Sequence, residues 1–581
     1  RADRRGVLEK MGELVSHTAR HRGDPLFDDG TVSASRVHIG VLGTDPQPVE
    51  SDGVLLWMDG EILSPGGYTA AARALIAAYR ADAEGSFAFL REFDGTYAAV
   101  LYDVAHGRVH LFGDRHGLRH LYVTVHDGCL VWGSEVKVVL AAPRFTPVIS
   151  REAVSEFVEV GYLLENRTWF EGVELIPSGT VVTWDAAGGT VSRRRYWWWD
   201  QIRPLTGRVD ERAAAEELGR RFVRAVERRC GEGESLGMQL SGGLDSRAIL
   251  AALPDEVVPL PAVTYGRRGS GDVRIAARAA RVRGVDHQVI ELNAAEWLPP
   301  RVAGMWWTDG HENLLHMHAI GINEEIRRRF GINLNGFLGD MVLGGSFMPS
   351  AAYVDAEITP ELAAGKLECS PALVPDLAAY RGLGKTDFFF LQNRMRRFTY
   401  SGTKYSQVAF EHRKPFLDYE LIDFAYALPD ALRFRSRVYK TMLLQRFPAL
   451  FHSIPWQSTG ASIRHSRPVE YALRFPRRVA YRVRRDLVRL GVPLQDTTTY
   501  TDYPGWIREE PARGFFHRLL ASGDALYTEF IPRERVVADL EAHQRGMDRA
   551  DMLCRYLSFE LWLQQVYNGA YRTGAPELEG A

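Results

Sequence analysis

Short runs of alternating apolar and polar residues fill the first third of the chain. They lie at residues 54–58, 97–102, 109–112, 120–125 and 129–132, with turn residues such as Asp127-Gly128 between them. A period of two is typical of strands with one buried face. A helical pattern interrupts the series at 68–80, and the aromatic run 196–199 closes it. Residues 1–205 are therefore predicted to form a β-rich domain that contains a helix.

The pattern changes after a link at 204–207 that contains proline and glycine. Residues 211–230 have the period of an amphipathic helix, and a short apolar strand at 236–240 meets a glycine-rich turn. A helix from about Ser246, a strand at 257–265 and a helix at 272–283 follow. This order is typical of a parallel α/β nucleotide-binding domain. Residues 206–581 are predicted to form that second domain, which is mainly helical beyond Asp340.

Composition excludes several classes of protein. The 581 residues carry a net charge of −2, with a pI near 6.8, so neither nucleic acid nor a membrane surface is favoured as a partner. No run of about 18 apolar residues occurs, and no apolar signal core follows the N-terminus. The four cysteines are far apart, so neither a zinc site nor a disulfide framework is expected. We expect a cytoplasmic protein with buried thiols.

The turn Ser241-Gly242-Gly243-Leu244-Asp245-Ser246 is the strongest candidate for a binding site. A loop between a strand and a helix presents unpaired backbone N–H groups to an anion, and the helix dipole adds positive potential. An aspartate beside pyrophosphate would be repelled unless a divalent cation lay between them, so Asp245 indicates Mg²⁺. The spacing differs from GxxxxGK[ST], which disfavours a P-loop that hydrolyses the β–γ bond. The alternative is an ordinary glycine turn.

This loop resembles the pyrophosphatase loop of asparagine synthetase-like enzymes, and further segments resemble that family's motifs in the same order. They are His21-Arg22-Gly23-Asp24, Asp59-Gly60-Glu61-Ile62, Gly113-Asp114-Arg115-His116-Gly117-Leu118 with Leu121-Tyr122, Ser134-Glu135-Val136-Lys137, Gly339-Asp340 with Gly344-Gly345, Glu411-His412-Arg413-Lys414-Pro415-Phe416-Leu417-Asp418, and Tyr439-Lys440 with Leu443-Leu444. The segment from Glu411 resembles the family's EVRVPFLD. The resemblance implies an N-terminal Ntn-hydrolase-like β-sandwich, similar to a class II glutamine amidotransferase. It also implies a C-terminal parallel α/β synthetase domain, similar to the adenine nucleotide alpha-hydrolases, that adenylates a carboxylate with ATP and Mg²⁺.

The same resemblance assigns roles to residues of the synthetase site. Asp245 and Asp340 would hold Mg²⁺, while Lys440 and Arg413 would neutralise the leaving pyrophosphate. For Asp340 a plain turn role, and for Lys440 a solvated helix charge, are the open alternatives. Asp272 is a weaker candidate, because it could equally cap the following helix. The residues expected to contact ATP are Leu240, Ser241, Gly242, Gly243, Asp245, Ser246, Thr264, Tyr265, Gly266 and Gly339.

The N-terminal half departs from a working glutaminase. Glutamine-dependent members of the family use an N-terminal cysteine, whereas residue 1 here is Arg. The asparagine that stabilises the oxyanion is replaced by Asp59, whose carboxylate would repel the developing charge. Residues 64–68 stand where the family's acidic glutamine-binding segment is expected. We therefore expect a vestigial, structural domain, and the alternative is a working amidotransferase.

The acceptor side of the synthetase site departs as well. Asparagine synthetases carry Glu, and β-lactam-forming relatives Tyr, where this chain has Phe337, which is neither an acid nor a base. A later lysine-containing motif is replaced by Ile454-Pro455-Trp456-Gln457-Ser458-Thr459-Gly460. These features resemble the lasso-peptide cyclases, which adenylate an Asp or Glu side chain of a precursor peptide and close a macrolactam with its N-terminal amine. Phe337, Trp456, Gln457 and Thr459 would then contact the peptide.

The partners that this resemblance implies are a precursor (core) peptide and a leader-peptide-binding protein or protease. The alternatives are a glutamine- or ammonia-dependent asparagine synthetase, a β-lactam synthetase-like enzyme and a non-enzymatic scaffold. Residues 464–489 carry nine arginines against two acids, which indicates either a solvated amphipathic helix or a docking surface for an acidic peptide or partner. A nucleic-acid role there lacks a supporting fold. His311, His316 and His318 are expected to be packing or surface residues.

Overall fold

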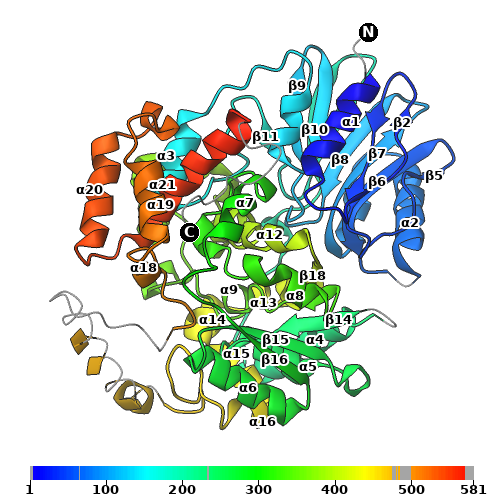
Figure 1. The fold of residues 1–581 in the computed structure, drawn as a ribbon. Coiled ribbons are helices and arrows are strands. Elements are labelled where there is room, and N and C mark those ends of the chain that lie inside the picture. Colours follow the sequence, from blue (N-terminus) through cyan, green and yellow to red (C-terminus); the bar gives the residue numbers. More distant parts are fainter. Residues whose placement is uncertain are drawn as a thin grey trace.

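Two kinds of β-sheet follow each other along the chain in the computed structural model (Figure 1). The structure describes residues 4–64, 66–231, 235–466, 468–473, 475, 479–480, 482–483 and 499–569. The sheets of the N-terminal half are antiparallel, and the large sheet of the C-terminal half is parallel. The predicted fold class, an antiparallel sandwich followed by a parallel α/β domain, is confirmed.

The N-terminal half packs a six-stranded sheet against a three-stranded one. Along β6 (Val54–Ile62), Leu56 and Met58 face α2 (Gly67–Ala81), while Leu55 and Trp57 belong to the core shared with the smaller sheet. This alternation follows from the period of two in the sequence. The six-stranded sheet has the order β13 (Thr190–Arg195), β12 (Thr180–Asp185), β8 (Arg108–Gly113), β7 (Gly95–Asp103), β6 and β5 (Val49–Ser51).

The smaller sheet has the order β10 (Cys129–Gly133), β9 (Tyr122–His126) and β11 (Glu174–Leu175). The helix α1 (Arg4–Val15) lies beside this sheet (Figure 1). Two short pairs complete the half, β1 (Arg22–Gly23) with β4 (Val37–His38) and β2 (Phe27–Asp28) with β3 (Ser33–Ala34).

Five parallel strands form the sheet of the C-terminal half. Their order is β16 (Asp286–Glu291), β15 (Pro261–Gly266), β14 (Leu236–Gln239), β17 (Ile332–Leu334) and β18 (Glu411–Arg413). The order reverses beside β14, because the chain leaves it first toward β15 and later toward β17. In open parallel sheets ligands bind outside the carboxyl ends of the strands at such a reversal. The glycine-rich turn follows β14, so it lies at that point.

Helices pack around this sheet and extend beyond it. The predicted helix at 211–230 is α4 (Glu211–Glu227), and α5 (Asp245–Ala252) starts inside the glycine-rich turn. The predicted helix at 272–283 is α6 (Gly271–Arg283), capped by the Ser270 hydroxyl. Toward the C-terminus, α19 (Ala512–Leu520), α20 (Arg533–Gln544) and α21 (Ala550–Trp562) pack together, and α21 also packs on α7 (Pro299–Trp307).

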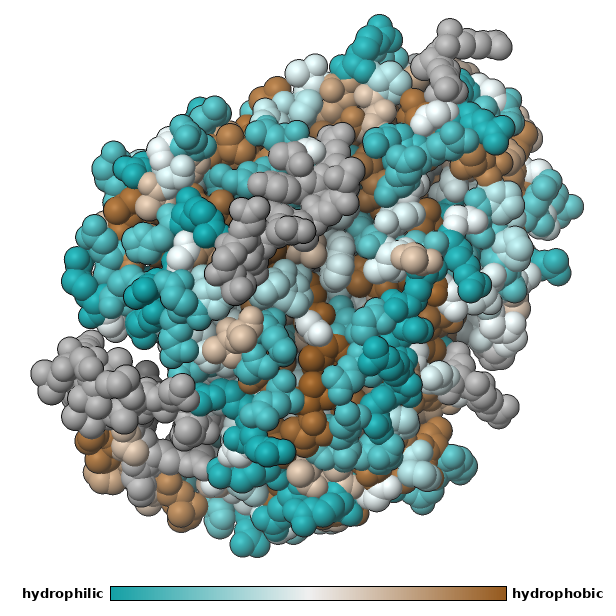
Figure 2. Space-filling view, viewed as in Figure 1, coloured by the Kyte–Doolittle hydropathy of each residue, from teal (hydrophilic) through white to brown (hydrophobic). Residues whose placement is uncertain are grey.

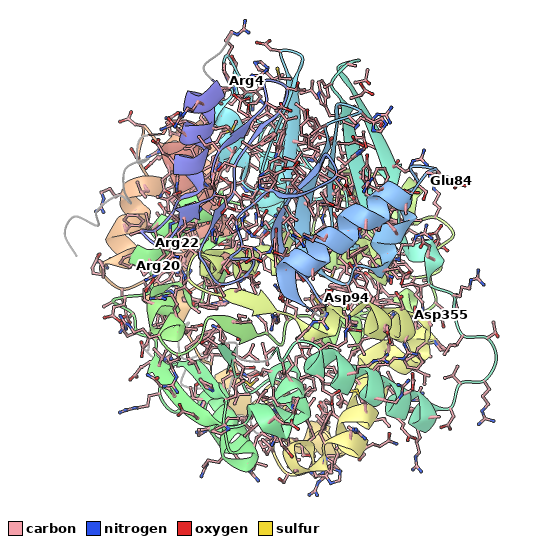
Figure 3. The ribbon with its side chains drawn as sticks, turned by 90° about the vertical axis from the view of Figure 1, so that its right-hand side faces the viewer. Arg4, Arg20, Arg22, Glu84, Asp94 and Asp355 are labelled. Atoms are coloured by element: carbon pink, nitrogen blue, oxygen red, sulfur yellow. The ribbon has the colours of Figure 1, made fainter. Side chains whose placement is uncertain are left out.

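The two halves share one apolar core, which contains Leu56 of β6 together with Phe222 of α4 and Phe416. Ion pairs cross the same boundary, where Asp94 lies 3.1 Å from Arg228 at the end of α4 (Figure 3). The division into 1–205 and 206–581 stays a prediction, although β13 ends at Arg195 and α4 begins at Glu211.

A membrane-spanning helix needs about 20 predominantly apolar residues, and this criterion can be applied to each helix within the described residues. None of the helices described there is both long and apolar enough to span a bilayer. The face in Figure 2 is mainly hydrophilic, with apolar residues interspersed in small groups.

Candidate functional site: the glycine-rich loop and the neighbouring aspartates

The glycine-rich loop is held in shape by its own hydroxyl groups. The Ser241 N–H donates to Ser246 Oγ at 3.0 Å, and the Gly243 N–H donates to Ser241 Oγ at 3.2 Å. The Gly242 N–H donates to Asp272 Oδ1 at 3.1 Å, so Asp272 is fixed to the loop itself. A β-carbon on Gly242 would lie 2.9 Å from Gln457 Cβ, which leaves no room for any side chain there.

A second loop, which follows β17, presses on the first and brings the two predicted aspartates together. The Asp340 N–H donates to Asp245 Oδ2 at 3.0 Å. A β-carbon on Gly339 would lie 2.5 Å from Asp245 Cγ, and one on Gly336 would lie 2.6 Å from the Ser246 nitrogen. Glycine at these two positions therefore permits the contact between the loops.

The electrostatics of this pair suit a cation. Burial, and next the charge of Asp340, raise the pKa of Asp245 to about 8, and burial also raises the pKa of Asp340. Two adjacent carboxylates disfavour each other's ionisation unless positive charge is supplied. Mg²⁺ is commonly bound by one or two carboxylates together with substrate phosphates, so Asp245 and Asp340 fit that ion. The Tyr439 hydroxyl donates to Asp245 Oδ1 at 2.8 Å and orients the carboxylate.

Two of the residues predicted to contact the peptide lie against the glycine-rich loop. The Gln457 N–H donates to the Gly242 carbonyl at 3.2 Å. The Lys440 Nζ, on α15 (Arg437–Arg446), lies 5.0 Å from the centre of the Trp456 ring. The expectation for Thr459 needs correction, because its side chain is buried and its hydroxyl donates to the Ala461 carbonyl at 3.1 Å. Thr459 therefore closes the turn that carries Trp456 instead of facing a peptide.

Arg413 also needs correction. It ends β18, but its guanidinium pairs with the carboxylate of Glu61, with N–O distances of 2.7 and 2.8 Å. A third N–H donates to the Arg229 carbonyl at 3.2 Å. In these contacts the guanidinium joins the two halves of the protein, which is a role that the sequence did not predict.

The strand end predicted to contact adenine and ribose is partly covered. The Thr264 hydroxyl is buried and donates to the Leu240 carbonyl at 2.7 Å. Gly266 has a φ of 147°, and a β-carbon there would lie 2.9 Å from Tyr500 Cβ. The Tyr265 and Tyr500 rings lie 6.5 Å apart. Sequence reasoning missed Tyr500 because nothing local in the chain marks a contact between residues so far apart.

Sequence reasoning also missed Lys414. Its Nζ lies 5.8 Å from the centre of the Phe337 ring and 4.8 Å from that of Tyr400. Burial, and then the charge of Arg119, lower the pKa of Lys414 to about 7. The signal was present in the segment that resembles EVRVPFLD, where this chain has lysine at the position of the second valine.

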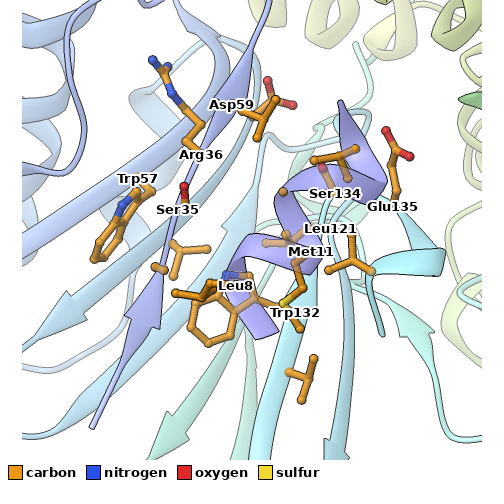
Figure 4. A pocket seen from close by; sticks show the side chains of 18 of the residues that line it. Leu8, Met11, Ser35, Arg36, Trp57, Asp59, Leu121, Trp132, Ser134 and Glu135 are labelled. Atoms are coloured by element: carbon orange, nitrogen blue, oxygen red, sulfur yellow. The ribbon is translucent and has the colours of Figure 1, made fainter. Parts of the chain in front are cut away.

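A cavity of about 860 Å³ is lined mainly by the N-terminal half and in part by the C-terminal half, through residues such as Tyr400 and Glu411. Figure 4 shows Leu8 and Met11 of α1 close to Leu121 and Trp132, with Trp57 across from them. Asp59 lies at the polar end of the cavity, where its carboxylate is 3.3 Å from Arg119. Arg119 also pairs with Glu411 of β18. The carboxylate that replaces the expected asparagine is thus part of an ion-pair network between the halves.

Comparison with known families gives two matches, one in each half of the chain. Residues 71–197 match the model of a glutamine amidotransferase domain, and residues 217–400 match the model of asparagine synthase. These two stretches of the chain are similar to the two families named. The glycine-rich loop and both aspartates fall inside the asparagine synthase match, whereas Asp59 precedes the amidotransferase match.

Curated relatives carry the same description. The glutamine-hydrolysing asparagine synthetase of Gallus gallus is 25% identical over 369 residues, which cover 61% of this chain and 60% of that enzyme. The human enzyme is 27% identical over 212 residues, 35% of this chain and 36% of that enzyme. The chain thus spans less than two thirds of either relative. A solved structure of the allosteric regulatory enzyme of purine biosynthesis matches over 49% of this chain and 77% of its own, at 11% identity and a TM-score of 0.24.

The three histidines singled out in the sequence contact residues outside the glycine-rich loop. His311 stacks on Tyr122, the Nε2 of His316 lies 3.5 Å from Asp551, and His318 bonds the Tyr503 hydroxyl at 2.9 Å. Within the described ranges no three His, Cys, Asp or Glu side chains gather as metal ligands. Most of the arginine-rich segment 464–489 lies outside the described residues, so its role stays a prediction.

Proposed function

We propose that this protein is an ATP-dependent amide-forming enzyme that activates a carboxylate as its acyl-adenylate and releases AMP and pyrophosphate. The observation that carries the proposal is the contact between the two loops, in which the Asp340 N–H meets the carboxylate of Asp245 beside the glycine-rich turn. A bare phosphate loop needs no second aspartate. Two aspartates placed beside a phosphate-binding turn suit the α–β bond of a bound triphosphate with its cation.

Each residue then has a physical task. The backbone N–H groups of the turn and the dipole of α5 attract the phosphates. Asp245 and Asp340 hold Mg²⁺, which supplies charge neutralisation at the phosphates when it is bound. Tyr439 keeps the Asp245 carboxylate oriented through its hydroxyl. Lys440, close to Trp456, adds positive charge for the leaving pyrophosphate.

The finer proposal concerns the acceptor. We propose that the acyl group is an Asp or Glu side chain of a precursor peptide, and that the peptide's own N-terminal amine closes a macrolactam. The buried, apolar Phe337 and the ion pair of Asp59 with Arg119 support this proposal, because both favour an amine supplied by the substrate over ammonia from glutamine. An intramolecular amine has an effective concentration of about 10⁵–10⁸ M when well oriented. A leader-peptide-binding protein or protease as a partner, and a cytoplasmic location, remain part of the proposal.

The test follows the nucleotide and the peptide together. Synthetic leader-free peptides are incubated with ATP and Mg²⁺, and the nucleotides are separated by chromatography. AMP and pyrophosphate are expected, with loss of one water mass from the peptide and protection of its amine from labelling. Asp245→Asn and Asp340→Asn should abolish turnover while the thermal unfolding midpoint stays near that of the parent. Formation of ADP and phosphate would refute adenylation.

The second candidate is asparagine formation. The names of the relatives favour it, since both are asparagine synthetases. The same assay is therefore run with aspartate and either ammonium chloride or glutamine. Asparagine as the product, with no peptide cyclised, would replace the macrolactam proposal and leave the adenylation proposal intact.

A further inference from the structure

Lys414 is a buried lysine to which the proposed reaction assigns no role. It directly follows β18, at the carboxyl edge of the parallel sheet. The loop after β17, which carries Phe337 and Asp340, runs beside it, because the Asn335 N–H donates to the Arg413 carbonyl at 2.8 Å. The Lys414 amine therefore lies beside the loop that holds one of the two predicted Mg²⁺ ligands.

The surroundings of this amine are mostly aromatic and apolar. The side chain is 98% buried, and its Nζ lies between the rings of Tyr400, at 4.8 Å, and Phe337, at 5.8 Å. Four charged groups act on it, namely Arg119, Glu411, Asp114 and Glu61. Glu411 already pairs with Arg119, and Glu61 with Arg413. Among the described residues no carboxylate forms an ion pair with Lys414 itself.

A lysine in this setting is suited to gaining and losing a proton near neutrality. Desolvation disfavours the ammonium form, and the nearby guanidinium of Arg119 disfavours it further. A group that is neutral in part of the physiological range can accept a proton and so act as a general base. General-base catalysis typically raises the rate of a reaction by about 10²–10⁴-fold. Phe337, which belongs to the neighbouring loop, has no group that can accept a proton.

From this geometry we propose that Lys414 is the general base for the amine that attacks the activated acyl group. The proposal rests on the proposed function, since it names the proton acceptor of the amide-forming step. The amine nitrogen forms a bond to the acyl carbon, and the bond from that carbon to the AMP oxygen breaks, with the electron pair leaving on AMP. The surplus proton of the nitrogen passes to the neutral Lys414 amine, which becomes an ammonium and later releases the proton to water.

The test separates the two half-reactions in Lys414→Met, which keeps a long side chain and removes the amine. Pyrophosphate–ATP exchange, measured with a peptide that supports it in the parent protein, should stay within about threefold. Amide formation with the same peptide should fall by about 100-fold or more. In the parent, the rate of amide formation should rise with pH through about 7, and this limb should vanish in the variant. Circular dichroism and thermal unfolding verify that the variant is folded.

Hydroxylamine can replace the peptide amine as the nucleophile, so it tests whether the variant still forms the activated acyl group. It is an uncharged nucleophile that needs little help from a base, so hydroxamate formation should be nearly equal in the parent and in Lys414→Met. An N-acetylated peptide is the matched control, because it should support exchange and form no amide. If Lys414→Met forms amide at the parental rate, or loses exchange and hydroxamate formation in parallel, Lys414 is not the base. Absence of exchange in the parent protein would instead refute the proposed function.

Discussion

Two glycines govern how closely the loops of the site approach each other. Gly336 and Gly339 face the backbone of Ser246 and the carboxylate of Asp245 at distances that no β-carbon tolerates. Glycine is required at these two positions for steric reasons and not for backbone conformation, because neither residue has a positive φ. A residue with no side chain thus sets the position of the aspartate that follows it.

Gly339→Ala should remove exchange activity and lower stability. The new methyl group would lie 2.5 Å from Asp245 Cγ and 2.7 Å from Phe416 Cζ, so the loop must shift. Overpacking of this kind costs about 1–3 kcal/mol. Urea unfolding and pyrophosphate exchange measure the two effects. Gly188→Ala is the control, since its nearest neighbour would lie at 3.5 Å. Parental exchange in Gly339→Ala would contradict the steric argument.

Tyr439→Phe should weaken metal binding without unfolding the protein. It removes the hydroxyl that donates to Asp245 at 2.8 Å, and a hydrogen bond to a charged group contributes about 1.5–3 kcal/mol. The Mg²⁺ concentration that gives half-maximal exchange should rise by about tenfold. The control is Tyr97→Phe, whose buried hydroxyl has no partner among the described residues. Equal effects of the two substitutions would argue against an orienting role for Tyr439.

The helices and strands show which features of the fold could be predicted from the sequence. The order β14, glycine-rich turn, α5 was predictable because each piece is local, and α2 and α4 fall within a few residues of their predicted ranges. Contacts between distant segments were not predictable. Tyr500 over Gly266, and Glu61 with Arg413, depend on how the elements assemble. A motif fixed the position of Arg413 in the sequence, but it carried no information on the carboxylate that the side chain meets.

The strand β8 makes the N-terminal sheet sensitive to acid through His110. This imidazole is buried between the Thr183 hydroxyl, at 2.9 Å, and the Tyr79 hydroxyl, at 3.1 Å, and burial lowers its pKa to about 4. In the unfolded chain a histidine titrates near 6.5. The unfolded state therefore binds more protons between these values, and the contribution of neutral His110 to stability is lost as pH falls from about 6.5 to 4.

His110→Asn should flatten this dependence. The difference in unfolding free energy between the parent and the variant should shrink by about 1–2 kcal/mol between pH 7.5 and 5.0. Urea titrations at several pH values measure it. A constant difference between parent and His110→Asn across that range would mean that His110 is not held neutral.

At the scale of the molecule, apolar and charged contacts connect the two halves. Their apolar core is shared, and charged pairs join them, including Arg413 with Glu61 and Arg115 with Asp423 at 3.0 Å. We expect a single unfolding transition in calorimetry, in spite of the two domain matches.

Glu61→Gln should lower the stability of the whole protein and not of the N-terminal half alone. It replaces a carboxylate that accepts two N–H groups of a buried guanidinium, a change that costs about 2 kcal/mol. The single transition should move to lower temperature as a unit. Glu84→Gln, at an exposed residue (Figure 3), should leave it in place. A first transition confined to the N-terminal half would show that the halves unfold independently.

The ion pairs of Arg119 with Asp59 and Glu411 bear on how much ATP the proposed reaction consumes for each amide formed. An activated acyl group is hydrolysed whenever water reaches it before the amine does. These three side chains line the cavity of the N-terminal half together with Tyr400 and Lys404 of the synthetase half. Water that entered between these side chains and reached the acyl-adenylate would hydrolyse it, and more ATP would be consumed per amide formed. In Arg119→Ala, AMP should therefore be produced without a matching amount of amide.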